Sequence, residues 1–155
     1  MALIMKTLIV YASVHHQNTE KVAKVMAEEL GADLVPVDEA QPETLTAYDL
    51  IGFGSGIYGR KFHKTLLQFV KGLPAVTGKQ GFIFSTRGGR EGPGHAAMKE
   101  MLVNRGFSIT GDFSCKGWDT VGTLKLFGGI NKGRPNEDDL AGARVFARGL
   151  KEKYT

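Results

Sequence analysis

A cluster of hydroxyl, amide and imidazole side chains follows a short apolar run near the start of the chain. It begins at Ser13 and ends at Asn18 and Thr19, where a helical pattern of apolar residues takes over. A helix start carries free backbone N–H groups and a partial positive charge, so these side chains add donors at a point that favours anions. Such a loop suits a phosphate group. The alternative is that Asn18 or Thr19 only caps the helix.

A second candidate segment, residues 54–59, reads Gly-Ser-Gly-Ile-Tyr-Gly and matches the dinucleotide-binding pattern G-x-G-x-x-G. We reject that interpretation because the segment follows the third expected strand and no acid occurs between residues 60 and 90 to hold a ribose. The glycines would instead let the backbone approach a flat ligand, on which Tyr58 could stack. Trp118 is a second candidate for that stacking role.

Other site chemistries find little support in the spacing of residues. His15, His16, His63, His95 and Cys115 show no arrangement typical of metal ligands. No Ser-His-acid constellation can be read from the sequence, and we interpret Ser85 as a hydrogen-bonding residue at a strand end rather than as a nucleophile. We therefore expect no metal site and no catalytic side chain.

Size and composition fit a single globular domain spanning residues 1–155. Hydrophobic residues make up 42% of the chain and charged residues 23%. We expect no membrane span because no apolar stretch reaches twenty residues, and the single cysteine fits a reducing cytoplasm. The net charge of +4 is modest, so its location matters more than its size, and we expect no nucleic-acid partner.

Apolar periodicity predicts strands that alternate with helices. The expected strands are residues 6–12, 33–38, 48–54, 80–85 and 107–115, and the expected helices are residues 18–30, 62–73, a segment around 98–102 that ends at Gly106, and one that starts at Asn136. Pro36 in the second strand and the alternation in the fifth predict that these two strands form the sheet edges. In the fifth strand we expect one face to carry Phe107, Ile109, Gly111, Phe113 and Cys115, and the other to carry Ser108, Thr110, Asp112 and Ser114.

This alternation predicts an α/β fold with three layers, in which a doubly wound, five-stranded parallel sheet has the order 2-1-3-4-5. The switch point then lies between strands one and three, where ligands bind beyond the carboxyl ends of the strands. Loops 13–19 and 55–60 would line one crevice, with loop 86–94 beside it. Residues 116–135 show no period of their own, and a loop of that length is commonly functional.

Together these segments resemble those of flavodoxins. Tyr11-Ala12-Ser13 followed by Asn18-Thr19-Glu20 is similar to the phosphate loop of that family, and residues 54–59 and 86–94 are similar to its second and third loops. The resemblance covers essentially the whole chain and implies bound FMN. It implies a phosphate loop formed by Ser13, His15, His16, Gln17, Asn18 and Thr19. It implies flavin-ring contacts on one side from Ser55, Gly56, Ile57, Tyr58 and Gly59, and on the other from Thr86, Arg87, Gly88 and Gly89.

The chain departs from the family in its first loop and in its charge. The first loop is one residue longer than usual, and His15-His16 replaces the usual threonine and glycine. Flavodoxins are usually acidic around the flavin, whereas here the strand-end loops carry nine basic residues and only two acids, Glu91 and Asp119. This basic rim consists of Arg60, Lys61, Lys64, Arg87, Arg90, Lys116, Lys125, Lys132 and Arg134. It favours an anionic partner or substrate.

Three functional hypotheses follow. The leading one is an FMN electron carrier that serves a redox protein with an acidic docking surface. The alternative is an FMN-dependent oxidoreductase acting on a quinone or a porphyrin-type substrate, and the third is a binding domain that has lost its cofactor. Gly59 is expected to act as a redox-coupled hinge, against the alternative that it only permits a tight turn. The oligomeric state is left open.

Overall fold

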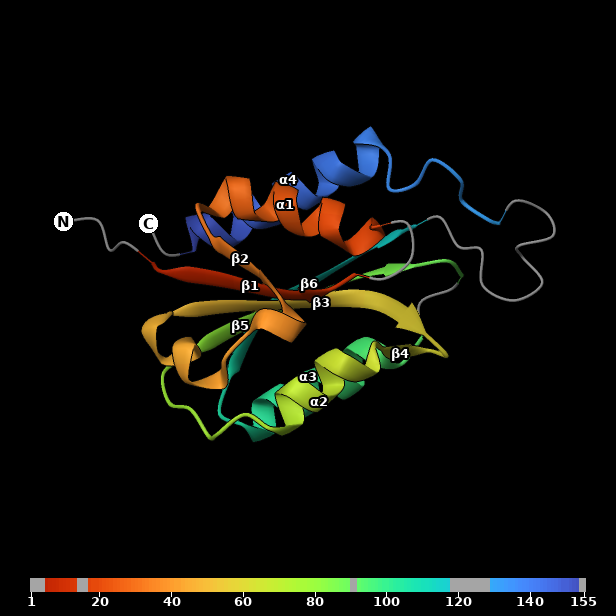
Figure 1. The fold of residues 1–155 in the computed structure, drawn as a ribbon. Helices are drawn as coiled ribbons and strands as arrows, with labels where there is room; N and C mark the ends of the chain where they lie inside the picture. The colour runs from red at the N-terminus through yellow and green to blue at the C-terminus, as the bar shows by residue number, and fades with distance from the viewer. Residues whose placement is uncertain (1–4, 14–16, 90–91, 118–128, 154–155) are drawn as a thin grey trace.

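The computed structural model describes residues 5–13, 17–89, 92–117 and 129–153 and shows a central sheet between two layers of helices (Figure 1). The helices α1 (Asn18–Leu30) and α4 (Glu137–Glu152) cover one face, and α2 (Lys64–Lys71) and α3 (Gly94–Asn104) cover the other. The strands are β1 (Thr7–Ala12), β2 (Asp33–Pro36), β3 (Leu50–Tyr58), β4 (Lys61–Phe62), β5 (Gln80–Arg87) and β6 (Ser108–Lys116). Two 3-10 helices, η1 (Val37–Glu39) and η2 (Pro42–Ala47), connect β2 to β3.

The sheet has the order β2-β1-β3-β5-β6, and all neighbours along this path are parallel. The short strand β4 pairs only with β3, in antiparallel orientation. Without the short strand β4, the strands β5 and β6 are the fourth and fifth in the chain, so the observed order is the predicted 2-1-3-4-5. The prediction is confirmed. The strands β2 and β6 lie at the two edges as expected, so the switch point falls between β1 and β3.

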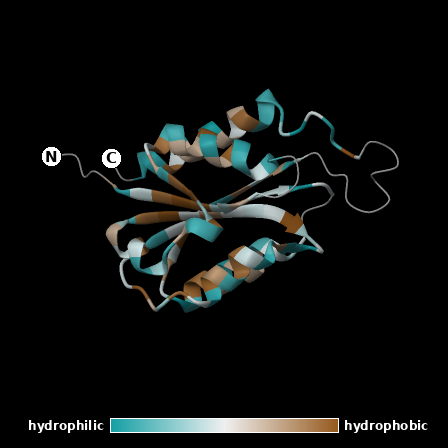
Figure 2. Cartoon of the chain, in the orientation of Figure 1, coloured by the Kyte–Doolittle hydropathy of each residue, from teal (hydrophilic) through white to brown (hydrophobic). Residues whose placement is uncertain are grey.

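Each face of the sheet carries its own apolar core. Phe53 of β3, Leu66 of α2 and Met98 of α3 are fully buried in the core beneath α2 and α3. Val22 of α1 and Phe84 of β5 are fully buried in the core beneath α1 and α4. Figure 2 shows hydrophobic residues along the strands, between helices whose outer sides are largely hydrophilic. The two layers of helices are therefore held by burial against a sheet that is apolar on both faces.

Glycines in β3 make room for aromatic rings of β5. A Cβ atom at Gly52 would lie 2.2 Å from Cζ of Phe82, and one at Gly54 would lie 2.1 Å from Cζ of Phe84. Both rings are fully buried, so neither can move aside cheaply. Gly54, the first glycine of the G-x-G-x-x-G match, thus has a packing role.

The strand β6 contains a bulge that the alternating sequence pattern did not predict. Ile109 pairs with Gly81, but the next pair joins Gly111 to Phe82, so Thr110 is an extra residue in β6. Ile109 consequently packs in the α2–α3 core, whereas Phe113 packs in the α1–α4 core. The expectation of one continuous apolar face on this strand is therefore wrong.

Several element boundaries also differ from expectation. The third strand does not end at residue 54 but runs to Tyr58, because the segment expected to be a loop pairs with β4. The fourth expected strand, here β5, extends to Arg87 because Thr86 and Arg87 pair with β6. The expected helix 62–73 is shorter, at Lys64–Lys71. Strand β2 ends at Pro36, and the last two residues of the expected strand, 37 and 38, belong to the 3-10 helix η1.

The start of the last helix agrees with its predicted capping. The side chain of Asn136 accepts a hydrogen bond from the Asp139 backbone N–H (3.0 Å), and the Asp139 carboxylate accepts one from the Asn136 N–H (2.8 Å). This reciprocal pair is a capping box. It fixes the point at which the chain enters α4 after the long segment that begins at residue 116.

Candidate functional site

The sheet register brings the three predicted segments together at the carboxyl ends of β1, β3 and β5. Ala12 pairs with Ser55, Ser55 pairs with Ser85, and Gly56 pairs with Thr86. Ser13 directly follows β1, so it lies next to this row. The expected convergence of the first, second and third segments on one edge of the sheet is present in the fold.

A hydrogen bond joins the first and third segments. The hydroxyl oxygens of Thr19 and Thr86 lie 2.8 Å apart, and the two residues are only 2% and 3% exposed. The Ser13 hydroxyl oxygen accepts a hydrogen bond from the backbone N–H of Glu20 at 3.2 Å. Two of the hydroxyls expected at the phosphate, those of Ser13 and Thr19, are thus held at the first turn of α1.

The start of α1 differs from the simple capping interpretation. Gln17 is the N-cap residue and has a left-handed backbone (φ 55°), and its side chain makes no cap bond; among the described residues, Ser13 bonds one first-turn N–H, that of Glu20. Asn18 is already helical and Thr19 is hydrogen-bonded to β5, so the alternative that either residue is only a cap is wrong. His15 and His16 lie outside the described residues. The helix start is therefore open to an anion, as its partial positive charge favours.

The second segment forms a hairpin rather than an open loop. Tyr58 pairs with Lys61, and the two residues between them, Gly59 (φ 54°) and Arg60 (φ 67°), both have left-handed backbones. Positive φ at both central positions defines a type I′ turn. Gly59 therefore lies in a tight turn, and both the redox-coupled hinge and the alternative that the residue only permits the turn stay predictions.

The side chains of the second segment are largely used inside the protein. The Ser55 hydroxyl is fully buried; it donates to the Gly56 carbonyl (2.7 Å) and accepts from the His63 N–H (3.0 Å). Ile57 packs against the α2–α3 core. The Tyr58 ring packs edge-on against the His63 ring, with 5.2 Å between the ring centroids. The Tyr58 side chain also covers Gly56, where a Cβ atom would lie 2.7 Å from the Tyr58 hydroxyl oxygen. A ligand beside this segment would therefore contact mainly its backbone groups.

The third segment is held by residues that the sequence did not indicate. The Arg87 guanidinium donates to the Ser114 hydroxyl (3.1 Å) and to the Gly89 carbonyl (2.9 Å). The side-chain amide of Asn131 donates to the Gly88 carbonyl at 2.7 Å. Asn131 belongs to the long segment after β6, so that segment helps to shape the site. This contact joins residues 43 positions apart and depends on tertiary structure alone, so no sequence pattern indicated it.

The end of β6 lies close to the start of α1. A Cβ atom at Gly117 would lie only 2.6 Å from Nδ2 of Asn18, and the Gly117 N–H donates to the Arg87 carbonyl at 2.9 Å. A larger residue would displace the Asn18 amide from its place. The glycine thus lets the first and third segments approach each other. Trp118, the second stacking candidate, lies outside the described residues.

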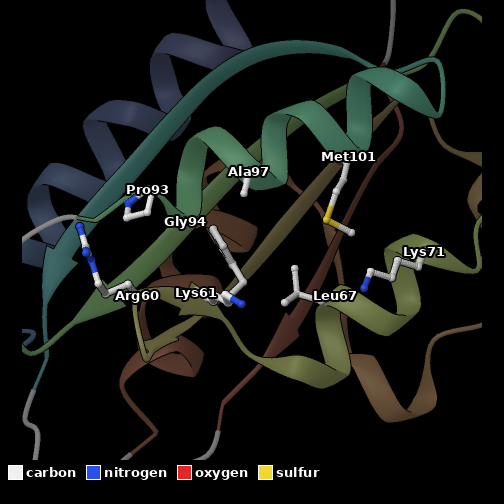
Figure 3. Close-up of a pocket in the computed structure, with 9 residues that line it drawn as sticks. Arg60, Lys61, Leu67, Lys71, Pro93, Gly94, Ala97 and Met101 are labelled. Carbon is white, nitrogen blue, oxygen red and sulfur yellow. The ribbon is translucent and has the colours of Figure 1, made fainter.

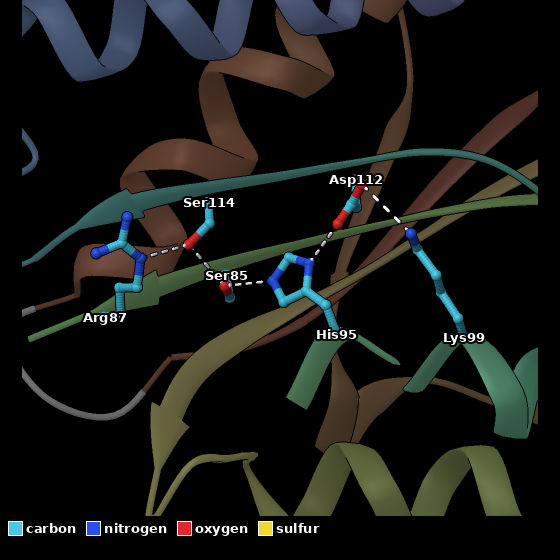
Figure 4. Close-up of polar contacts among 6 residues, drawn as sticks. All are labelled: Ser85, Arg87, His95, Lys99, Asp112 and Ser114. Atoms are coloured by element: carbon cyan, nitrogen blue, oxygen red, sulfur yellow. Dashed lines mark hydrogen bonds and ion pairs between the residues drawn. The ribbon is translucent and has the colours of Figure 1, made fainter. Parts of the chain in front are cut away.

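A polar network with a buried centre, Ser85 and His95, lies behind the third segment, on the α3 side of the sheet (Figure 4). Ser85 Oγ lies 2.6 Å from Nε2 of His95, and Nδ1 of His95 lies 2.8 Å from the Asp112 carboxylate. Ser114 extends this network from Ser85 (3.1 Å) to Arg87, and the Lys99 ammonium lies 3.6 Å from Asp112. These residues come from β5, α3 and β6, so their spacing along the chain carried no signal.

The arrangement of Ser85, His95 and Asp112 resembles a nucleophile–base–acid set, but its burial argues against that chemistry. Ser85 is 1% exposed and His95 is 6% exposed. A nucleophile must reach the substrate, and this hydroxyl is enclosed between β5, β6 and α3. The interpretation of Ser85 as a hydrogen-bonding residue near a strand end agrees with this geometry.

The charges near the site are distributed unevenly. Arg134 of the basic rim makes a bidentate pair with Asp139 (Nη2–Oδ1 2.6 Å), and this hydrogen-bonded pair holds the pKa of Asp139 below its usual range. Arg60 and Lys61 have no ion pair within the described ranges. Arg90, Glu91, Asp119 and Lys125 lie outside those ranges. The β3–β4 hairpin thus carries two adjacent cations that no described acid neutralises.

Acidic groups line a cavity of about 350 Å³ beside Ser13. Its walls include Tyr11, Glu20, Asp38 and His63. The Tyr11 hydroxyl donates to Glu20 at 3.4 Å, and burial together with the Glu20 charge raises the pKa of Tyr11. The surroundings of the first segment are therefore less basic than the sequence count suggests.

Neither a metal-binding cluster nor a membrane-spanning helix occurs among the described residues. Within those residues, no three His, Cys, Asp or Glu side chains come close enough to hold a metal ion. None of the helices in the part of the chain with assigned structure is long and apolar enough to cross a bilayer.

Comparisons with known proteins show the family through a family model, and the fold through solved structures. The model of the flavodoxin domain family matches residues 8–116. The uncharacterized protein MJ0298 from Methanocaldococcus jannaschii is 48% identical over 148 residues, which are 94% of this chain and 98% of that one. The fold is similar to that of oxidised flavodoxin 2 from Bacillus cereus (TM-score 0.75, 24% identity, 96% of this chain and 99% of that chain). It is also similar to a flavodoxin from the domain Archaea (TM-score 0.72, 18% identity, 97% and 99%).

Proposed function

The chain belongs to the flavodoxin domain family, and from this premise we propose that it binds FMN and carries electrons between redox proteins. The observation that carries the proposal is the buried contact between Thr19 and Thr86, which ties the expected phosphate loop to the third segment. This contact holds the Thr19 hydroxyl in the first turn of α1, where Ser13 also bonds and an anion is favoured. A single such loop suits the one phosphate of FMN better than the two of FAD.

The donor set fits a phosphate monoester. Ser13, Asn18 and Thr19 bring hydroxyl and amide groups, and the first turn of α1 brings backbone N–H groups. We assign His15, His16 and Gln17 to the same loop. Backbone N–H groups at a helix start have no partner within the helix and gain hydrogen bonds when they meet an anion, which supports the phosphate at this end of the cofactor.

The ring of the cofactor is assigned to the second and third segments. Ser55, Gly56, Ile57, Tyr58 and Gly59 would offer mainly backbone on one side, and Thr86, Arg87, Gly88 and Gly89 would line the other. When bound, FMN supplies the redox chemistry, since flavins accept one or two electrons. The part of this chain is to orient the ring, to exclude water and to set the local charge. The Arg87 guanidinium, held by Ser114 and Gly89, would favour added negative charge by Coulomb attraction.

The positive hairpin supports an acidic redox partner. Arg60 and Lys61 are exposed and carry no ion pair among the described residues, so they are available to meet carboxylates. Such steering raises association rates and weakens as salt screens the charges. The same charges also fit the alternative, an oxidoreductase with an anionic porphyrin-type or a quinone substrate. A cytoplasmic location stays a prediction that rests on the single cysteine.

The cofactor is tested by its spectrum and by matched ligands. We expect the purified chain, after mixing with FMN, to show a bound-flavin spectrum, and we expect riboflavin, which lacks the phosphate, to bind at least tenfold more weakly. Thr19→Val should raise the Kd for FMN by roughly tenfold, since a hydrogen bond to a charged group contributes about 1.5–3 kcal/mol. Thr19→Ser keeps the hydroxyl and serves as the control. Equal affinity for FMN and riboflavin would refute the phosphate assignment.

A second experiment separates a carrier from an oxidoreductase. The FMN-loaded protein is given a nicotinamide donor with quinones, and separately a reduced flavodoxin reductase with an acceptor protein. A carrier shuttles electrons between the two proteins, at a rate that falls with salt. Sustained quinone turnover with the nicotinamide donor alone would favour the oxidoreductase instead.

A further inference from the structure

A groove between α2 and α3 lies apart from every residue assigned to the flavin. It has a volume of about 240 Å³, and its walls are formed by Phe62 of β4, Leu67 of α2, and Ala97 and Met101 of α3 (Figure 3). Leu67 and Met101 are half-buried, and Ala97 is exposed. In Figure 3 the Met101 side chain extends toward Leu67 across the space between the helices. The groove is therefore an apolar surface that faces solvent.

The groove has cations at its edge and no acid in its lining. Arg60, Lys61 and Lys71 all contribute to its walls, and none of its lining residues is Asp or Glu. Within the described part of the chain these three cations also form no ion pair elsewhere. In Figure 3 the Lys61 and Lys71 side chains flank Leu67. Unneutralised ammonium groups beside an apolar surface favour a ligand that is both anionic and apolar.

One end of the groove is more positive than the other. The helix α3 begins at Gly94, next to Arg60 and Lys61, and no side chain of the described residues caps it. A Cβ atom at Gly94 would lie 3.1 Å from the Arg60 carbonyl oxygen, so the hairpin turn is packed directly on the helix start. The partial positive charge of this helix end adds to that of the two side chains. Lys71, by contrast, stands where α2 ends and the helix dipole is negative.

We propose that this groove binds a small amphipathic carboxylate. The carboxylate pairs with Lys61 at the start of α3, and an unbranched apolar tail lies along Leu67, Ala97 and Met101. Methionine adapts its shape readily, which suits a flexible tail. The ligand combines the two features of the groove, since neither a bare anion nor a neutral tail would use both the charge and the apolar wall. The site does not depend on FMN, because none of these residues belongs to the flavin assignment.

The proposal is tested by titration calorimetry of the purified full chain with octanoate, 1-octanol and acetate. We expect saturable binding of octanoate at one site, with 1-octanol and acetate each at least tenfold weaker. Amide resonances of Leu67, Ala97 and Met101 should shift with octanoate. Equal affinities for octanoate and 1-octanol would overturn the proposal, as would shifts confined to other parts of the chain.

Two pairs of variants locate the site. Lys61→Gln should weaken octanoate binding about tenfold, whereas Lys64→Gln, an exposed lysine of α2 outside the groove, should leave it unchanged. Ala97→Trp should fill the groove and abolish binding, whereas Ala96→Trp, on the same helix but outside the groove, should not. Equal effects within either pair would overturn the proposal. Self-association that Ala97→Trp removes and Ala96→Trp retains would also overturn it, since a second copy would then cover the groove.

The outcome is separable from that of the proposed function. Calorimetry and amide shifts need neither flavin nor redox activity, so octanoate binding can be measured whether or not FMN binds. Conversely, loss of the groove in Ala97→Trp should leave FMN affinity unchanged.

Discussion

The hydroxyl of Thr19, on the first turn of α1, lies 2.8 Å from the hydroxyl of Thr86, near the end of β5, although 67 positions separate them in the chain. Both residues are buried away from water, so each hydroxyl serves as the hydrogen-bond partner of the other. The pair connects a helix on one side of β1 to a strand two positions away in the sheet. The geometry of the candidate site therefore depends on their mutual bond.

Removing both hydroxyls of this pair should cost less stability than the sum of the two single removals. Thr19→Val or Thr86→Val leaves a buried hydroxyl unsatisfied, at a cost of about 1–3 kcal/mol in the free energy of unfolding. The double variant should cost less than the sum, because no orphaned group remains. Urea unfolding of the FMN-free protein measures this, with the exposed Thr46→Val as control. Strictly additive losses would show that the two hydroxyls are not coupled.

The hairpin turn predicts opposite effects at adjacent positions. Gly59→Ala should lower the free energy of unfolding by about 1–2 kcal/mol, the cost of a left-handed backbone for a residue with a Cβ. Arg60→Gly should raise it by roughly 0.5–1 kcal/mol, since it relieves that strain but adds chain entropy to the unfolded state. Gly149→Ala, in the last turn of α4 where a Cβ would have nothing within 4 Å, should be stabilising and controls for loss of a glycine. If Gly59 is also a hinge, Gly59→Ala will shift the two one-electron potentials of bound FMN unequally.

The Ser85–His95–Asp112 network is expected to be structural. Fluorophosphonate probes should not label Ser85 in the folded protein, because the hydroxyl is enclosed. Ser85→Ala should lower the free energy of unfolding by about 1–3 kcal/mol, since it leaves a buried imidazole nitrogen without its partner. Ser108→Ala, at an exposed position of β6, should change stability little. Labelling at Ser85 would point to a hydrolytic role instead.

Cys115 should be unreactive in the native state. Burial raises the pKa of this thiol to about 12, so almost no thiolate is present at neutral pH. Disulfide reagents should therefore modify it only after unfolding. Because the folded pKa is raised, the thiol ionises first in the unfolded chain, so stability should fall as pH rises above about 8.5, the value of a free cysteine. Cys115→Ala should remove this alkaline slope.

Asp139 should make the start of α4 sensitive to acid. Its hydrogen bond with Arg134 lowers its pKa, so its contribution to stability is present above the unfolded pKa of about 4 and is lost as pH falls below it. Unfolding measured from pH 7 to pH 2.5 should show this loss, and Asp139→Asn should flatten the curve. Asp138→Asn, at an exposed position on the same turn, is the matched control. Equal curves for both variants would contradict the assignment.

The order of the strands in the sheet could be predicted from one residue and from the alternation of elements along the chain. Pro36 restricted the second strand to an edge, and the alternation of helices and strands left few topologies. The convergence of Ser13, Thr19 and Thr86 followed from that order. The length of β3 could not be predicted, because its last residues are strand only through pairing with Lys61 and Phe62, which is a tertiary effect.

The polar network was beyond sequence reasoning for a different reason. His95 and Asp112 meet only because β6 changes face at Thr110, and the alternating pattern of the strand gave no sign of an extra residue. Likewise, Asn131 contacts Gly88 from a segment that has no periodicity. Contacts of this kind join residues far apart in the sequence and depend on the tertiary fold, which local sequence patterns do not encode.

The bulge at Thr110 also marks the one position of β6 at which a residue can be lost without changing the register. Deleting Thr110 would leave Ile109 opposite Gly81 and Gly111 opposite Phe82, so Phe113 and Cys115 would stay on the α4 side and Asp112 and Ser114 on the α3 side. An insertion between Gly111 and Phe113 would instead exchange apolar and polar side chains across the sheet, unless the strand formed a second bulge. We therefore expect natural variants of this chain that are shorter within β6 to lack the residue at position 110.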